Sequence, residues 1–271
     1  MAYGERPVLN QLSLSVPQGE TLALLGANGA GKSTTLKAAL GLIPVLSGSA
    51  RFFGQPLAKV RQRVGYMPQA AEVDWNFPTT VADVVTMGTY GRLGWCRRPG
   101  RKSRDRSLTA LEQVGIPELA DRHIAQLSGG QKQRTFLARI LAQDPELFIM
   151  DEPFAGVDAG SERAITSVLR DLHGRGKTIV IVHHNLATVR DFCTWTALLK
   201  DGAAHAHGPT AEVFRASTVA EAYGLDVFAE TPGHPTSAAR PASTAGTVSA
   251  ASAYQATSER PEPASFPGFP A

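Results

Sequence analysis

Gly26-Ala27-Asn28-Gly29-Ala30-Gly31-Lys32-Ser33-Thr34 is the stretch of this sequence that decides the fold. It follows the apolar run at residues 21–25, which predicts a buried strand, and it precedes a stretch with helical spacing. Glycines at this spacing before Lys-Ser let consecutive backbone N–H groups turn toward one anion, and the helix start adds its positive dipole end. All nine residues are therefore candidates for binding the phosphates of a nucleotide.

Two acidic residues follow a second buried strand, predicted over residues 147–150. Because the carboxyl ends of parallel strands meet at one edge of a sheet, Asp151 and Glu152 are expected beside the phosphate loop. There Lys32 can reach the β- and γ-phosphates, Ser33 can ligate Mg²⁺ and Asp151 can hold the water shell of the metal. Glu152 can polarise an attacking water. Such a pair can also be a solvated strand end, but the neighbouring loop favours catalysis.

Short apolar runs alternate with amphipathic stretches along the chain, which is typical of an α/β fold with a largely parallel sheet. Between about residues 70 and 127 the strand pattern stops, and residues 80–87 and 107–114 have helical spacing. This interval is predicted to be a helical subdomain inserted in the sheet domain. The predicted strands are residues 21–25, 51–53, 64–67, 147–150, 178–182 and 196–199.

The stretch Leu127-Ser128-Gly129-Gly130-Gln131, which we call the signature, opens a further helical run. Taken alone, Ser128 could simply cap that helix, because serine accepts hydrogen bonds from free N–H groups at a helix start. A cap does not explain the whole order of motifs, in which the chain resembles the ATP-binding cassette (ABC) family of ATPases over about residues 1–225. That order is the phosphate loop, Gln69 after a strand (GYMPQ), LSGGQ, MDEP at residues 150–153, AGVD at residues 155–158, and His184 after a strand.

The resemblance implies a P-loop NTPase core with a mostly parallel sheet, an antiparallel β portion near the N-terminus and the helical subdomain, all within residues 1–230. It also implies hydrolysis of ATP with Mg²⁺ by two copies that pack head to tail. In such a dimer Ser128, Gly129, Gly130 and Gln131 of one copy would close on the γ-phosphate that residues 26–34 of the other copy hold.

The resemblance also implies roles for single residues. Gln69 would contact Mg²⁺ or the attacking water, Asp158 would bridge the two copies, and His184 would contact the γ-phosphate. Tyr3 would stack on adenine, although only Met1 and Ala2 precede it where the family normally has a further strand. The residue after His184 is Asn where many members have Asp.

Residues 74–92 hold seven large apolar side chains, more than the core face of one short helix requires, so a groove that receives a partner's helix is expected there. This stretch, the basic residues 91–106 and VHHNL at residues 182–186 resemble the ATPase subunits of bacterial manganese, zinc or iron importers. The resemblance implies a separate membrane permease, an extracytoplasmic solute-binding protein and a peripheral place at the cytoplasmic face of the membrane. The alternatives are an ABC importer ATPase for another small solute and a soluble ABC ATPase outside transport.

Composition excludes other classes. The chain is 43% hydrophobic and 19% charged, and no apolar run approaches the ~18 residues of a membrane-spanning helix. Its net charge of +3 reflects a basic cluster at residues 97–106, which is either a solvated loop or a contact for acidic lipid or an acidic partner. One such cluster without stacking aromatics does not favour nucleic acid as a partner. Residues 231–271 hold seven of the 18 prolines and are predicted to be a disordered tail.

Overall fold

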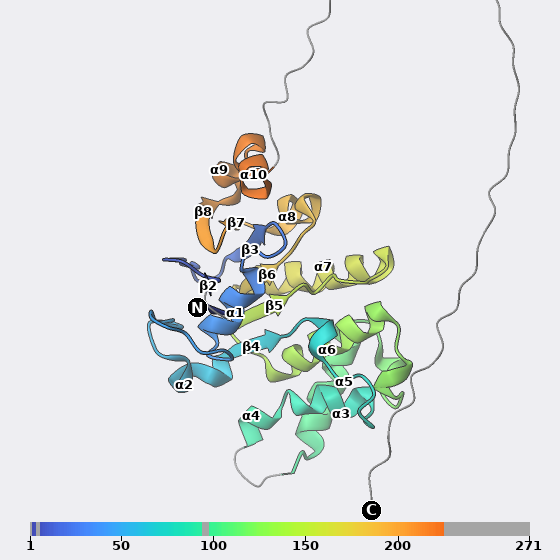
Figure 1. The fold of residues 1–271 in the computed structure, drawn as a ribbon. Helices are drawn as coiled ribbons and strands as arrows, with labels where there is room; N and C mark the ends of the chain where they lie inside the picture. Colours follow the sequence, from blue (N-terminus) through green and yellow to red (C-terminus); the bar gives the residue numbers. More distant parts are fainter. Residues whose placement is uncertain (1, 4–5, 94–97, 225–271) are drawn as a thin grey trace, which may run out of the picture. The chain divides into compact units, whose positions relative to one another are not determined.

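A six-stranded sheet forms the centre of the protein. The computed structural model describes residues 2–3, 6–93 and 98–224, which lie in the unit Met1–Ala229. The sheet order is β4-β5-β6-β3-β7-β8, in which every neighbouring pair is parallel except β7 with β8 (Figure 1). The predicted α/β fold with a mostly parallel sheet is confirmed. The strands are β3 (Thr21–Gly26), β4 (Val64–Met67), β5 (Leu147–Asp151), β6 (Thr178–Val182), β7 (Trp195–Lys200) and β8 (Ala203–Pro209).

Each central strand sends alternate side chains to opposite faces of the sheet. Ala23 and Leu25 of β3 pack in one buried cluster with α6 (Gly129–Gln143) and α7 (Ala159–Gly174). Leu22 and Leu24 pack in a second cluster, which includes Leu36 of α1 (Lys32–Ala39). Because both faces are covered, the strands are continuous apolar runs, which is why the sequence reveals them.

The interval 70–127 contains helices and short 3-10 turns, and its described residues include no strand. Thr80 and Asp83 form a capping box that starts α3, and α3 and α5 pack on α6 around a shared core. Figure 1 shows α3, α4 and α5 gathered beside α6. The elements are η2 (Ala70–Glu72), α3 (Val81–Met87), α4 (Tyr90–Leu93), α5 (Arg101–Gln113), η3 (Pro117–Leu119) and η4 (Ile124–Gln126).

The remaining elements lie outside this interval. An antiparallel pair of two-residue strands is present near the N-terminus, as expected. These elements are β1 (Ala2–Tyr3), β2 (Arg6–Pro7), α2 (Leu57–Val60), η1 (Arg61–Arg63), α8 (Leu186–Phe192), α9 (Thr210–Val213) and α10 (Ala216–Tyr223).

One predicted strand is absent, and one predicted helix is present but begins earlier than its spacing indicated. The strand predicted at residues 51–53 is a turn, because Phe53 and Gly54 have φ of 52° and 74° and Phe52 makes only an isolated bridge with Gln55. The helix predicted from residue 107 begins at Arg101, so most of the basic cluster is helical rather than a loop. Cations at a helix start oppose the dipole, which is why the cluster did not suggest a helix. Arg97 and the predicted tail lie outside the described residues.

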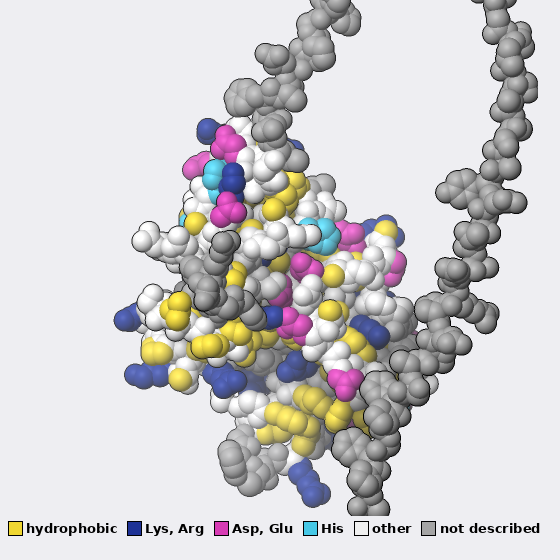
Figure 2. Space-filling view, viewed as in Figure 1, with side chains coloured by type: hydrophobic (Ala, Val, Ile, Leu, Met, Phe, Trp, Pro, Cys, Tyr) yellow, Lys and Arg dark blue, Asp and Glu magenta, His cyan; other side chains and the backbone are white. Residues whose placement is uncertain are grey.

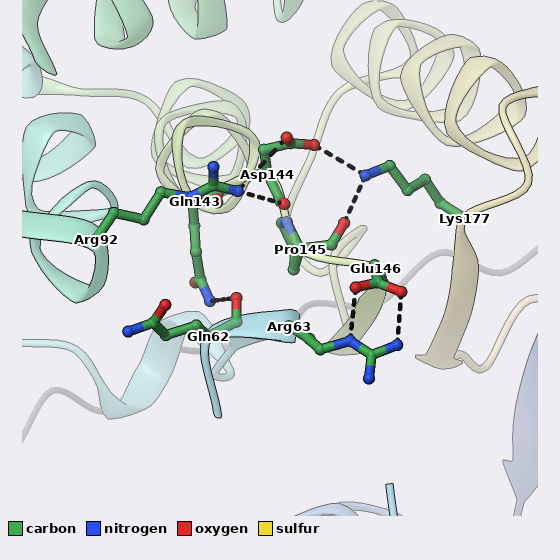
Figure 3. A network of polar contacts seen from close by, with 8 residues as sticks. All are labelled: Gln62, Arg63, Arg92, Gln143, Asp144, Pro145, Glu146 and Lys177. Atoms are coloured by element: carbon green, nitrogen blue, oxygen red, sulfur yellow. Dashed lines mark hydrogen bonds and ion pairs between the residues drawn. The ribbon is translucent and has the colours of Figure 1, made fainter. Parts of the chain in front are cut away.

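A network of polar contacts lies at the amino ends of β5 and β6 (Figure 3). Arg92 of α4 donates to the carbonyl oxygens of Gln143 (3.0 Å) and Asp144 (2.9 Å) at the end of α6. Lys177 donates to Asp144 Oδ1 (2.8 Å), and Arg63 binds Glu146 through two hydrogen bonds of 2.6 and 2.7 Å. The network thus joins α4 to the sheet at the end away from the phosphate loop.

Gly88 is a position at which backbone packing permits no side chain. A Cβ placed there would lie 2.0 Å from the carbonyl oxygen of Arg139, and Gly88 has an ordinary helical φ of −57°. We expect Gly88→Ala to lower the free energy of unfolding by about 1–3 kcal/mol and the melting temperature by several degrees. Gly174→Ala is the control, because a Cβ there meets nothing within 4 Å and alanine favours helix. Equal melting temperatures for the two variants would contradict this packing.

Candidate active site

The phosphate loop spans the carboxyl end of β3 and the start of α1. A Cβ at Gly26 would lie 2.3 Å from the carbonyl oxygen of Leu199, and Gly31, the residue before α1, has φ of 95°. Both positions therefore require glycine. Lys32 Nζ donates to the carbonyl oxygens of Gly26 and Ala27, both at 2.9 Å, so the ammonium lies inside the loop. Burial lowers the pKa of Lys32, while Glu152 and Asp151 act to raise it.

Asp151 is the last residue of β5 and is fully buried. Its Oδ1 accepts a hydrogen bond from Ser33 Oγ at 2.8 Å, and its Oδ2 has no hydrogen-bond partner among the described residues. Burial raises the pKa of Asp151, an effect that the hydrogen bond from Ser33 opposes. A buried carboxylate oxygen without a partner, next to a hydroxyl, suits a hard cation such as Mg²⁺. The residues present thus fit the metal that the sequence predicts.

Glu152 lies directly after β5 with a left-handed backbone (φ 52°). Its Oε2 accepts a hydrogen bond from Gln69 Nε2 at 2.9 Å, which joins two motifs 83 residues apart. Gln133, a buried residue that sequence reasoning missed, donates to the carbonyl oxygen of Ala155 at 3.3 Å. In the sequence, Gln133 is notable only as a polar residue on the inward face of α6. Its role in holding the loop after Glu152 is visible only in the structure.

The signature forms the first turn of α6. Ser128 accepts a hydrogen bond from the N–H of Gln131, whose side chain accepts one from the N–H of Ser128, so the cap expected from the sequence is present. A Cβ at Gly129 would lie 2.4 Å from the carbonyl oxygen of Gly156, and one at Gly130 would lie 2.2 Å from Ser161 Oγ. The glycines thus let the signature pack against the start of α7.

Asp158 caps α7. Its carboxylate accepts hydrogen bonds from the N–H (2.9 Å) and the hydroxyl (2.8 Å) of Ser161, and these bonds lower the pKa of Asp158. Its predicted role between two copies stays a prediction. The side chain of Tyr3, the predicted adenine contact, lies outside the described residues.

The two histidines after β6 differ in environment. His183 is 1% exposed, and its ring is stacked on Phe154 with centroids 4.7 Å apart. Neither ring nitrogen has a hydrogen-bond partner among the described residues, and burial lowers the pKa of His183 to about 4. His184 is exposed. Of the two, His184 is therefore the one that can meet a nucleotide outside the strand ends.

Comparison with known proteins finds relatives that match this chain along most of its length. The model of a family described as ABC transporter matches residues 9–155, just over half of the chain. The zinc transport system ATP-binding protein TroB of Treponema pallidum is 50% identical over 224 residues, 83% of this chain and 84% of that protein. The manganese transport system ATP-binding protein MntB of Bacillus subtilis is 47% identical over 224 residues, 83% of this chain and 89% of that protein. A dimeric ATP-binding cassette bound to ADP and phosphate has a TM-score of 0.69 and 26% identity, covering 77% of this chain and 94% of that one.

Proposed function

This chain belongs to the ABC transporter family of ATPases, and from that premise we propose that it energises uptake of a manganese, zinc or iron ion through a separate membrane permease. The observation that carries the ATPase role is the meeting of Lys32, Ser33, Asp151 and Glu152 at one edge of the sheet. The zinc and manganese transport proteins among its relatives, each covering 83% of the chain, support the metal cargo.

We assign Mg²⁺ to the oxygen ligands of this edge. Ser33 Oγ, the carboxylate of Asp151 and the side chain of Gln69 would hold it. When bound, Mg²⁺ supplies positive charge that neutralises the phosphates. A buried Asp151 carboxylate is costly without such a partner, and this cost favours binding of the metal with the nucleotide.

The protein's own groups divide the remaining work. Lys32 exchanges its two loop carbonyls for phosphate oxygens, because an ammonium binds an anion more strongly than a neutral acceptor. Glu152 polarises the attacking water, and Gln69 holds the carboxylate in place. His184 donates a hydrogen bond to the phosphoryl oxygen as charge develops. In the proposed dimer, the signature of the second copy completes the site.

A groove of about 980 Å³, lined by residues just after α1, by α2 and by the carboxyl-terminal parts of α3 and α6, is the proposed permease site. Leu42 and Met87 line it and are 53% and 37% exposed. Figure 2 shows hydrophobic side chains over α2 and α3 with Lys and Arg between them. The described residues that line the groove include Lys59, Arg61 and Arg139 and no acid, so a helix with apolar and acidic side chains suits it.

The sequence assigned too many residues to this surface. Val81, Val84 and Val85 are 0–6% exposed and form the core of α3, whereas Phe77 and Tyr90 are exposed. No helix in the described part of the chain is both long and apolar enough to cross a bilayer.

Charges in the groove should separate hydrolysis from transport. We expect Leu42→Asp with Met87→Asp to leave the melting temperature nearly unchanged and the basal ATPase rate of the isolated chain within about twofold. Both side chains are exposed, and neither residue belongs to the phosphate loop. Binding to the permease should be lost, since a charge buried at an interface costs several kcal/mol. Co-purification from detergent measures this.

Leu108→Asp is the matched control, because Leu108 is 47% exposed on α5 and does not line the groove. Retention of the permease by the Leu42/Met87 variant would refute the groove assignment. The function itself is tested by the ATPase rate of the complete complex, which should rise when the solute-binding protein is loaded with manganese, zinc or iron. No rise with any of these metals would favour one of the two alternatives.

A further inference from the structure

The segment that begins at Gln69 contacts three elements of the site. Gln69 donates to Glu152 at 2.9 Å, after β5. Glu72 forms an ion pair with Lys37 of α1, the helix that follows the phosphate loop. Trp75, six residues after Gln69, contacts α6, the helix that begins with the signature. The last of these contacts has no role in the function described so far.

Trp75 binds its own segment and α6 at once. Its Nε1 donates to the carbonyl oxygen of Ala70 at 2.8 Å, the residue next to Gln69. Its ring meets Phe136 edge to face, with centroids 5.1 Å apart and an interplanar angle of 65°. Lys132 Nζ lies 4.9 Å from the ring centroid. One side chain therefore connects the Gln69 loop to the amino-terminal half of α6.

We propose that Trp75 is a positioning residue that makes the signature move together with the Gln69 loop. The contacts on α6 begin four residues after Ser128, and a 15-residue helix moves as a rigid unit, so a displacement of Trp75 displaces Ser128 and Gly130 with it. The inference rests on the proposed function, because the position of the signature matters only when it closes on a nucleotide held by a second copy.

Trp195 is the matched residue for separating this role from simple packing. It is also partly buried, it packs against the second core cluster, and its ring lies 5.5 Å from that of His207. It is in β7, and its ring contact joins β7 to β8 rather than two motifs. The same substitution at both tryptophans removes a comparable buried ring, but only Trp75 contacts the helix of the signature.

The test is ATP-driven dimerisation of the full chain carrying Glu152→Gln, measured by analytical ultracentrifugation with Mg²⁺ and ATP. We expect Trp75→Leu to weaken dimerisation about tenfold, while the affinity of the monomer for ATP stays within about twofold. Trp195→Leu should lower the melting temperature without changing dimerisation. Lys132→Met should weaken dimerisation about threefold, because it removes the cation from the Trp75 ring and keeps the aliphatic stem.

The outcomes decide between the claims. Unchanged dimerisation of Trp75→Leu and Lys132→Met overturns this inference and leaves the proposed function intact. A Glu152→Gln parent that stays monomeric overturns the proposed dimer and this inference with it. If Trp75→Leu does not fold, Trp75→Phe decides, because it keeps a ring against Phe136 and removes only the N–H bond to Ala70. We expect Trp75→Phe to weaken dimerisation about threefold, and unchanged dimerisation would contradict the role of Trp75.

Discussion

Glu152→Gln is expected to reduce ATP turnover about a thousandfold while ATP binding is retained. The amide keeps the shape of the carboxylate and can still contact Gln69, but it cannot accept a proton from water, and loss of a general base typically costs 10²–10⁴ in rate. Phosphate release under saturating ATP measures the rate. Because hydrolysis no longer separates the copies, an ATP-bound dimer should accumulate.

Glu146→Gln is the control for this change, because Glu146 lies just before the same strand, at the opposite end, where it pairs with Arg63 on the surface. Its turnover should stay within about twofold of the parent, since exposed ion pairs contribute little. Lys32→Ala should differ from both variants, because it removes the phosphate contact and with it ATP binding. If Glu152→Gln hydrolyses ATP at more than a tenth of the parent rate, Glu152 is not the general base.

His184→Ala is expected to reduce turnover about a hundredfold, because the loss of a hydrogen-bond donor to developing charge costs roughly 2–4 kcal/mol. His183→Ser should cost at least about tenfold less in turnover, since its ring is buried against Phe154 and points away from solvent. Both variants should bind ATP.

His183→Ser should instead lower the melting temperature, because it leaves a cavity beside Phe154. Thermal unfolding of the two histidine variants separates this effect from catalysis. A larger loss of turnover at His183 than at His184 would show that the exposed histidine is not the phosphate contact.

The buried central strands and the order of the motifs were predictable because both depend on local sequence. β3, β5 and β6 are buried on both faces, so their apolar runs are unambiguous, and the residues that follow them are placed together by the parallel sheet. The turn at residues 51–53 was not predictable, because a turn with Phe53 at positive φ has no strong local signal. The start of α5 was hidden by its cations.

The contacts that organise the site were not predictable, because they join residues far apart in the sequence. Nothing in the spacing of Gln69 and Glu152 indicates that they share a hydrogen bond, and nothing in the signature reveals that Gln133 holds the loop beyond Glu152. The seven apolar residues of the segment after Gln69 divide between core and surface only once α3 packs on α5 and α6. Composition can count such residues, but only packing can assign them.

The most direct test of the proposed function is ATP-dependent accumulation of radioactive manganese, zinc or iron in liposomes that contain the permease. This chain and ATP are enclosed inside the liposomes, and the solute-binding protein is added outside. We expect uptake of at least one of these metals with the parent chain and none with Glu152→Gln. ATP hydrolysis by the complete complex without accumulation of any of the three metals would contradict the proposed function.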